Sequence, residues 1–187
     1  AVTLRADLVV FGRIAGAAAA QWASDHGATH RNEEQAAEIE AFALAPLERQ
    51  EGENPYAIQH DLQDVMQDLV GIARVESELS EALEKISALR TRAASAASPG
   101  NREYNPGWHT ALDLWNLLDV SEAVTRSALG RRESRGAHSR IDHMDKDDHF
   151  GTVNTVARRA ADGTIETEHM PVIGKTDELA GIVKEMG

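Results

Sequence analysis

Three stretches of the chain carry apolar residues at helical positions, the first two at spacings of three and four, and this pattern constrains the fold more than any other feature. The spacing places the apolar side chains of each stretch on one face of a helix. A single amphipathic helix is marginal in water, so three of them predict a bundle that buries the stripes against one another. The apolar positions are Ile58, Leu62, Val65, Met66, Leu69 and Ile72, then Leu79, Leu83, Ile86 and Leu89, then Leu112, Trp115, Leu118, Ala123 and Ala128.

Two more helices are predicted before the bundle. A run rich in alanine and branched apolar residues predicts one from Asp7 to about His26, and Asn32 is a suitable N-cap for another that ends near Phe42. The first of them is apolar nearly all round, so it needs burial on most sides. A polar stretch from Leu47 to Asn54 then leads into the bundle.

The character of the sequence changes after Gly136. From Thr152 to Val172 branched and polar residues alternate, and Asp162-Gly163 separates two such runs. An Asp-Gly step between alternating runs predicts a β-hairpin. The tail from Thr176 to Met186 is compatible with a short terminal helix.

The predicted fold class is therefore mainly α: a bundle of three long amphipathic helices with a short C-terminal extension that contains a β-hairpin. We expect a helical lead-in segment over residues 1–54 and the three-helix bundle over 55–136. A polar loop, the hairpin and the tail occupy 137–187.

Composition excludes several classes of protein. The chain has 187 residues, no cysteine and a formal net charge of -12. It therefore has no disulfide framework and no cysteine nucleophile, and no nucleic-acid partner is expected because phosphate binding needs a basic surface. Its most apolar run, from Leu8 to Ala20, is shorter than a membrane span and contains Arg13.

The residue patterns do not predict a complete active site. We find no G-x-S-x-G, no phosphate loop and no G-x-G-x-x-G after a strand. A segment from His138 to His149 is dense in His and Asp, which suits a divalent metal, but its spacing matches neither a helical zinc pair nor a calcium loop. We assign no catalytic residue and no metal ligand.

The string ESRGAHSR from Glu133 to Arg140, followed by Asp142 and by Asp147-Asp148, resembles the C-terminal signature of succinate dehydrogenase and fumarate reductase flavoprotein subunits. Three earlier blocks resemble the same family in order and spacing, so the resemblance covers about residues 6 to 150. Aspartate oxidases share the Glu-Ser-Arg-Gly core, but the Ala-His-Ser-Arg continuation favours the succinate group. The earlier blocks are DLVVFGR from Asp7 with Ala15-Gly16, Leu62-Gln63 and Met66-Gln67 with Gly71 and Arg74, and DLWNL from Asp113.

This resemblance implies a subunit that interconverts succinate and fumarate with FAD and passes electrons to an iron–sulfur subunit. In the family the FAD-binding and capping domains precede this region. FAD is thus expected in the intact subunit but not in this chain alone, which is expected to be inactive. The implied partners are the FAD-binding domain and the iron–sulfur subunit, and the implied location is cytoplasmic, peripheral on the inner face of the cell membrane.

Under the resemblance, Glu133, Arg135, His138 and Arg140 are candidates for the contact layer between the bundle and the FAD-binding domain. The other interpretation is that these four residues only lock the end of the last bundle helix. Two further hypotheses remain open: a non-enzymatic helical interaction module derived from the family, and a metal-binding protein that uses the His/Asp segment. The apolar first helix also predicts possible self-association of the isolated chain.

Overall fold

The computed structural model describes residues 2–27, 31–161 and 163–186, and it contains two compact units, Ala1–Phe42 and Ala43–Gly187. The first unit holds helix α1 (Val2–His26) and the start of α2 (Glu33–Glu48). The predicted first helix is confirmed and begins earlier than Asp7. Its described apolar side chains, among them Val10, Phe11 and Trp22, are exposed.

Helix α2 continues past the predicted end near Phe42 and contains Pro46 in its last turns. Proline has no N–H to donate to the carbonyl four residues earlier, so the last turns of α2 lack one helical hydrogen bond. Two hydrogen bonds from later parts of the chain hold this end of α2 in place. The indole nitrogen of Trp108 donates to the carbonyl of Ala43 at 2.6 Å, and the Ser98 amide donates to the carbonyl of Pro46 at 2.7 Å.

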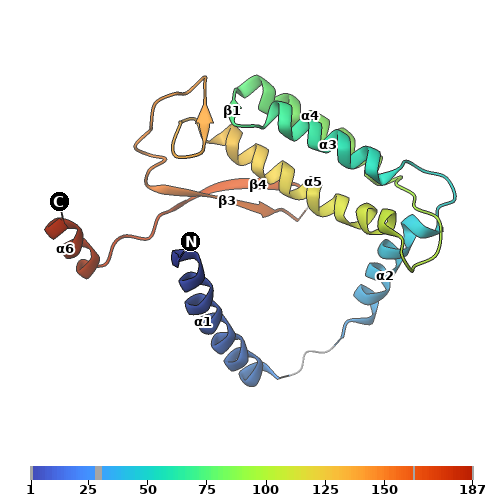
Figure 1. Cartoon of the computed structure of the whole chain (residues 1–187), viewed down its shortest axis with the longest axis horizontal. Helices are drawn as coiled ribbons and strands as arrows, with labels where there is room; N and C mark the ends of the chain where they lie inside the picture. The colour runs from blue at the N-terminus through green and yellow to red at the C-terminus, as the bar shows by residue number, and fades with distance from the viewer. Residues whose placement is uncertain (1, 28–30, 162, 187) are drawn as a thin grey trace. The chain divides into compact units, whose positions relative to one another are not determined.

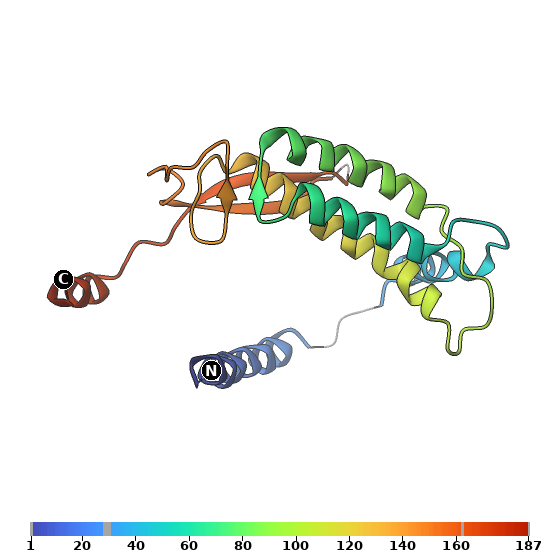
Figure 2. The ribbon, with the colours of Figure 1, turned by 45° about the horizontal axis from the view of Figure 1, so that its top comes forward.

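The predicted bundle is confirmed as α3 (Pro55–Leu69), α4 (Glu76–Ala93) and α5 (Pro106–Gly130), which lie side by side in Figures 1 and 2. Helices α3 and α5 begin in the same way: the Asn54 and Asn105 side chains accept a backbone N–H of the first turn, and a proline follows each. Proline suits the first helical position because its missing N–H would have had no helical partner.

Apolar side chains from all three helices form the core. Fully or nearly fully buried are Ile58 and Leu62 of α3, Leu79, Ile86 and Leu89 of α4, and Ala111, Leu114 and Leu118 of α5. Two details of the predicted stripes differ from the structure. Ile72 lies beyond the end of α3 and is 85% exposed. On α5 the predicted Leu118 and Ala128 are buried and Trp115 packs against the core. Leu112, however, is only partly buried, and the buried face also contains Leu114 and Thr125.

Two small sheets complete the second unit. Strand β1 (Ala73–Arg74) pairs in parallel with β2 (Ser139–Arg140), so the residues after α3 meet the residues that follow α5. The predicted hairpin is formed by β3 (Val153–Arg159) and β4 (Ile165–Pro171), antiparallel in register, and it runs along α5 (Figure 1). Of the predicted turn, Gly163 has φ +87°, whereas Asp162 lies outside the described residues. Helix α6 (Asp177–Met186) follows as predicted.

Candidate functional site

The segment from Arg131 to Arg140 folds back against the end of α5. Gly136 has φ +62°, a conformation in which a side chain would be strained, and this residue forms the turn. On either side of the turn, the Arg135 amide donates to the His138 carbonyl at 2.8 Å and the His138 amide donates to the Arg135 carbonyl at 3.1 Å. The turn therefore places the side chains of this segment around one helix end.

Glu133 is completely buried and is shared by two arginines. Nε of Arg131 and Nε of Arg135 each donate to Glu133 Oε1 at 2.9 Å, and the backbone N–H of Asp147 donates to Oε2 at 2.9 Å. Hydrogen bonding by Arg135, supported by Asp147 and Arg131, outweighs burial and lowers the pKa of Glu133 to about 2. The carboxylate is thus ionised at neutral pH, and the two arginines keep one surplus positive charge.

Arg140 is the second fully buried charged residue, and its guanidinium caps the end of a helix. Its guanidinium bonds both carboxylate oxygens of Asp142, at 2.7 and 2.8 Å, and its Nη1 donates to the last carbonyls of α5, at 3.0 Å from Ala128 and 3.1 Å from Leu129. Asp142 also accepts the backbone N–H of Glu76 at 2.8 Å, at the start of α4. The hydrogen bond from Arg140 holds the pKa of Asp142 well below its usual range. One ion pair therefore caps two helices.

His138 connects this helix end to β1. Nη1 of Arg74 lies 2.9 Å from His138 Nδ1, and the carbonyl of Arg131 lies 2.9 Å from Nε2. Because a guanidinium only donates, Nδ1 accepts and Nε2 carries the proton. Burial, together with the positive charges of Arg74 and Arg131, lowers the pKa of His138. The imidazole is therefore neutral at neutral pH.

A groove of about 660 Å³ lies beside this cluster, between α5 and β3. Its lining includes Arg74, His138, Val120, Val124 and Thr155. Of the four residues predicted for the contact layer, Arg135 and His138 line this groove, whereas Glu133 and Arg140 have no exposed surface.

One small group of side chains is a candidate metal site. Among the described residues, Glu76, Asp142 and His143 have ligand atoms that lie within 4.8 Å of one another. Both oxygens of Asp142 already bond Arg140, and Glu76 has arginine nitrogens at 3.6 and 3.8 Å. Arginine thus supplies the positive charge that these carboxylates need.

The described residues do not fit an FAD cradle. Both sheets in the described part are two-stranded, and neither leads through a glycine-rich turn into a helix, which is the arrangement that binds a dinucleotide pyrophosphate. None of the described helices combines the length and apolar content that a membrane span requires.

Sequence reasoning named Arg74 only as part of a family block and did not connect it with His138. The two residues lie 64 positions apart, so no local spacing reports their contact. It also gave Thr155 no role beyond that of a hairpin residue. The one local signal for Arg74 is that it follows the end of a helix, where arginine commonly bonds free carbonyls. Its Nε does donate to the carbonyls of Val70 and Gly71, at 3.0 and 2.9 Å.

Comparisons with known proteins agree on one family. Residues 59–180 match the family model described as "Fumarate reductase flavoprotein C-term". The fumarate reductase flavoprotein subunit of Mycobacterium tuberculosis is 36% identical over 174 residues, which is 89% of this chain and 30% of that protein. The corresponding Escherichia coli subunit is 32% identical over 172 residues, 89% of this chain and 29% of the relative. The chain therefore spans about 30% of the length of these relatives.

Solved structures give the same result. The chain of Mycobacterium smegmatis Sdh1 in complex with UQ1 matches with a TM-score of 0.83 and 37% identity, over 95% of this chain and 31% of that chain. An E. coli quinol fumarate reductase structure matches with a TM-score of 0.79 and 31% identity, over 91% of this chain and 30% of that one. The chain thus belongs to the family of C-terminal regions of succinate dehydrogenase and fumarate reductase flavoprotein subunits, which are parts of oxidoreductases.

Proposed function

We propose that this chain is the helical C-terminal domain that supports FAD-dependent interconversion of succinate and fumarate, while the FAD and substrate sites lie in another region of the same subunit. The observation that carries the proposal is the family match over residues 59–180, which contains the bundle core except Ile58, and the buried cluster at the end of α5. In this proposal the chain contributes no group to the redox step, and its residues support the region that holds the flavin.

The proposed contacts follow the predicted division of the chain. The lead-in over residues 1–54 packs on the FAD-binding domain through the apolar surface of α1, while 55–136 and 137–187 present the end of α5 to it. Arg135 and His138 then contact that domain directly, and Glu133 and Arg140 hold them in place from behind. An iron–sulfur subunit completes the electron path, and the assembly is cytoplasmic, peripheral on the inner face of the cell membrane through partner subunits.

The test compares the purified chain with the chain mixed with a separately expressed partner. The partner is the part of the M. tuberculosis relative that precedes its matched region, and this fragment alone is the control. We expect the chain alone to retain no FAD and to oxidise no succinate, and the mixture to do both, as measured by flavin absorbance and by reduction of a dye acceptor.

Retention of FAD and succinate oxidation by the chain alone would contradict the proposal. The second candidate function, a non-enzymatic interaction module, is favoured by the exposed apolar residues of α1. That function predicts that the mixture forms a complex but gains no activity over the partner fragment.

A further inference from the structure

The groove between α5 and β3 contains a cation without a carboxylate partner. Within the described residues, Arg74 forms no ion pair: its Nε bonds the carbonyls of Val70 and Gly71, and its Nη1 bonds the neutral imidazole of His138. Nothing on these neighbours cancels its charge. A half-buried guanidinium that bonds only neutral groups has the capacity to bind an added anion.

The nearby charges do not remove this capacity. Arg131 and Arg135 also line the groove, but both are already paired with Glu133. The negative charges of Asp147 and Asp148 also partly offset the positive charge of Arg135. The groove therefore carries surplus positive charge, and Arg74 is the arginine of its lining that has no acidic partner among the described residues, in a chain whose net charge is -12.

A second group in the groove also lacks a partner. The side-chain oxygen of Thr155 is buried and makes no hydrogen bond with any described residue. An unsatisfied buried hydroxyl is costly, and it is rare in folded proteins. Thr155 lines the same groove as Arg74, so the groove holds two polar groups that have capacity for a further acceptor.

The remaining wall of the groove is partly apolar, with Ser127 and Asn154 as its polar members. Val120 and Val124 are 63% and 40% exposed, and they stand one helical turn apart on α5 together with Ala123. An apolar strip that ends in a guanidinium and a hydroxyl suits an extended segment that carries one carboxylate beside apolar side chains.

We propose that this groove binds an aspartate or glutamate of the flavin-binding region, with the carboxylate on Arg74 and Thr155 and the neighbouring apolar side chains on Val120 and Val124. The inference rests on the proposed function, and it adds a specific anchor to it. One observation favours this occupant over a second copy or the tail of the same chain: about 70% of each relative's length lies outside the part that this chain matches. Within that region, the charge of Arg74 selects an acidic residue.

The experiment measures binding of short overlapping peptides to the intact chain by fluorescence anisotropy. The peptides cover the M. tuberculosis relative ahead of its matched region, and a second set covers this chain's own sequence. We expect a peptide of the first set to bind, and to contain an Asp or Glu next to apolar residues. Changing that acid to its amide, or Arg74→Gln, should weaken binding at least about tenfold.

Val120→Asp is the second test variant, because this exposed position should tolerate the change while the new charge repels the peptide. Arg102→Gln is the matched control: Arg102 is an exposed arginine in the loop before α5, and its loss should leave binding unchanged. Circular dichroism of each variant shows whether it is folded.

Three results would overturn the inference: no flavin-region peptide binds, a peptide of this chain binds best, or binding is unchanged in both Arg74→Gln and Val120→Asp. The mixing experiment on FAD and succinate separates this outcome from failure of the proposed function. If activity is recovered in the mixture while the peptides fail, only the anchor is wrong.

Discussion

At the scale of the residue, Glu133 shows how much of this site depends on one ionised group. The carboxylate has no exposed surface and joins Arg131, Arg135 and the amide of Asp147. Removing one partner from such a cluster leaves uncompensated buried charge, which costs more than the net stabilisation that the intact cluster provides.

We expect Glu133→Gln to lower the free energy of unfolding by about 3 kcal/mol at neutral pH. The folded pKa of Glu133 is lowered to about 2 from the ordinary value of 4.5, so the carboxylate stabilises the fold above pH 4.5 and loses this effect as the pH falls toward 2. Urea denaturation across this range measures the effect. The free energy of unfolding of the variant should fall less steeply in acid than that of the wild type. The lowered pKa of Asp142 should account for part of the fall that remains.

Glu84→Gln is the control for this series, since Glu84 is an exposed residue of α4. An acid dependence in Glu133→Gln that equals the wild-type one would show that Glu133 is not a source of the pH effect.

His138 reports directly on the charge of Arg74. We expect an NMR titration to give His138 a pKa below 6.5 in the wild type, and a higher one in Arg74→Gln. The substitution removes a positive charge and the donor that occupies Nδ1, while most of the burial stays. Arg102→Gln should not change the titration. An unchanged His138 pKa in Arg74→Gln would mean that Arg74 is not a cause of the lowered value.

At the scale of the element, the sequence predicted the three bundle helices well because leucine and isoleucine carry the 3.6-residue period of α3 and α4. The buried face of α5 was predicted only in part, because it contains Ser121 and Thr125 beside the predicted Leu118 and Ala128. The hydroxyl of Thr125 donates to the carbonyl of Ser121 at 2.7 Å, so this polar group is satisfied inside the helix, and the residue packs like an apolar one.

The candidate site was predictable only in part. The motif placed Glu133 and Arg140 near the end of α5 but could not say that both are fully buried, because their partners come from other segments. The contact of Arg74 with His138 depends on the pairing of β1 with β2, two strands of two residues each. Such short strands carry no periodic signal.

Close packing of the α2–α3 connection against the segment after α4 yields a prediction about glycine. A Cβ on Gly52 would lie 2.3 Å from the carbonyl oxygen of Ser95 and 2.6 Å from the Cβ of Ala97, whereas one on Gly130 would meet nothing within 4 Å. We expect Gly52→Ala to destabilise the chain by about 1–3 kcal/mol and Gly130→Ala to change stability by less than about 1 kcal/mol. Urea unfolding curves of the two variants measure this difference. Equal stabilities would mean that the connection moves freely away from Ser95.

At the scale of the whole molecule, the apolar surface of α1 is the feature that most needs a partner. Six large apolar side chains of this helix are exposed to water, and an exposed apolar surface of this kind favours association with another surface. They are Leu8, Val9, Val10, Phe11, Ile14 and Trp22. The isolated chain is therefore expected to self-associate.

We expect Phe11→Asp to reduce this association, because a charge in a buried apolar contact is costly. Sedimentation equilibrium should show a lower average mass for the variant at the same concentration. Ser87→Asp, on the exposed side of α4, adds the same charge elsewhere and should leave the mass unchanged. A wild-type chain that stays monomeric at every concentration would refute the prediction.

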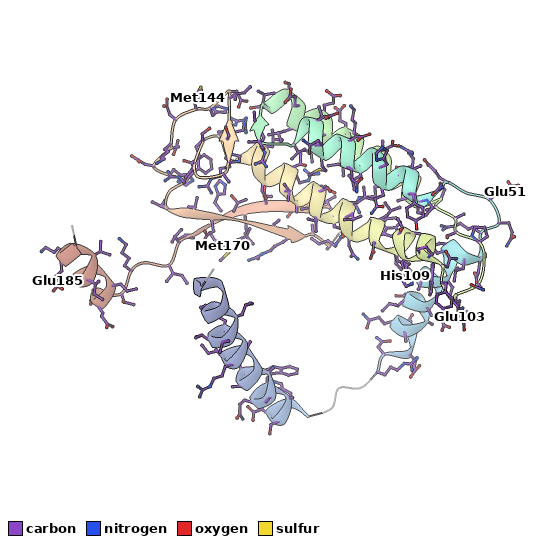
Figure 3. All side chains as sticks on the ribbon, in the orientation of Figure 1. Glu51, Glu103, His109, Met144, Met170 and Glu185 are labelled. Atoms are coloured by element: carbon purple, nitrogen blue, oxygen red, sulfur yellow. The ribbon has the colours of Figure 1, made fainter. Side chains whose placement is uncertain are left out.

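The walls of the groove come from stretches that are far apart in the sequence. Arg74 precedes His138 by 64 residues, and Thr155 follows later still on β3. The loop residues Glu51 and Glu103, and His109 in the first turns of α5, lie at the end of the bundle away from β1 (Figure 3). During synthesis the groove cannot form before β3 has left the ribosome, because β3 supplies one of its walls. The proposed recognition of the flavin-binding region therefore begins only after β3 has been synthesised.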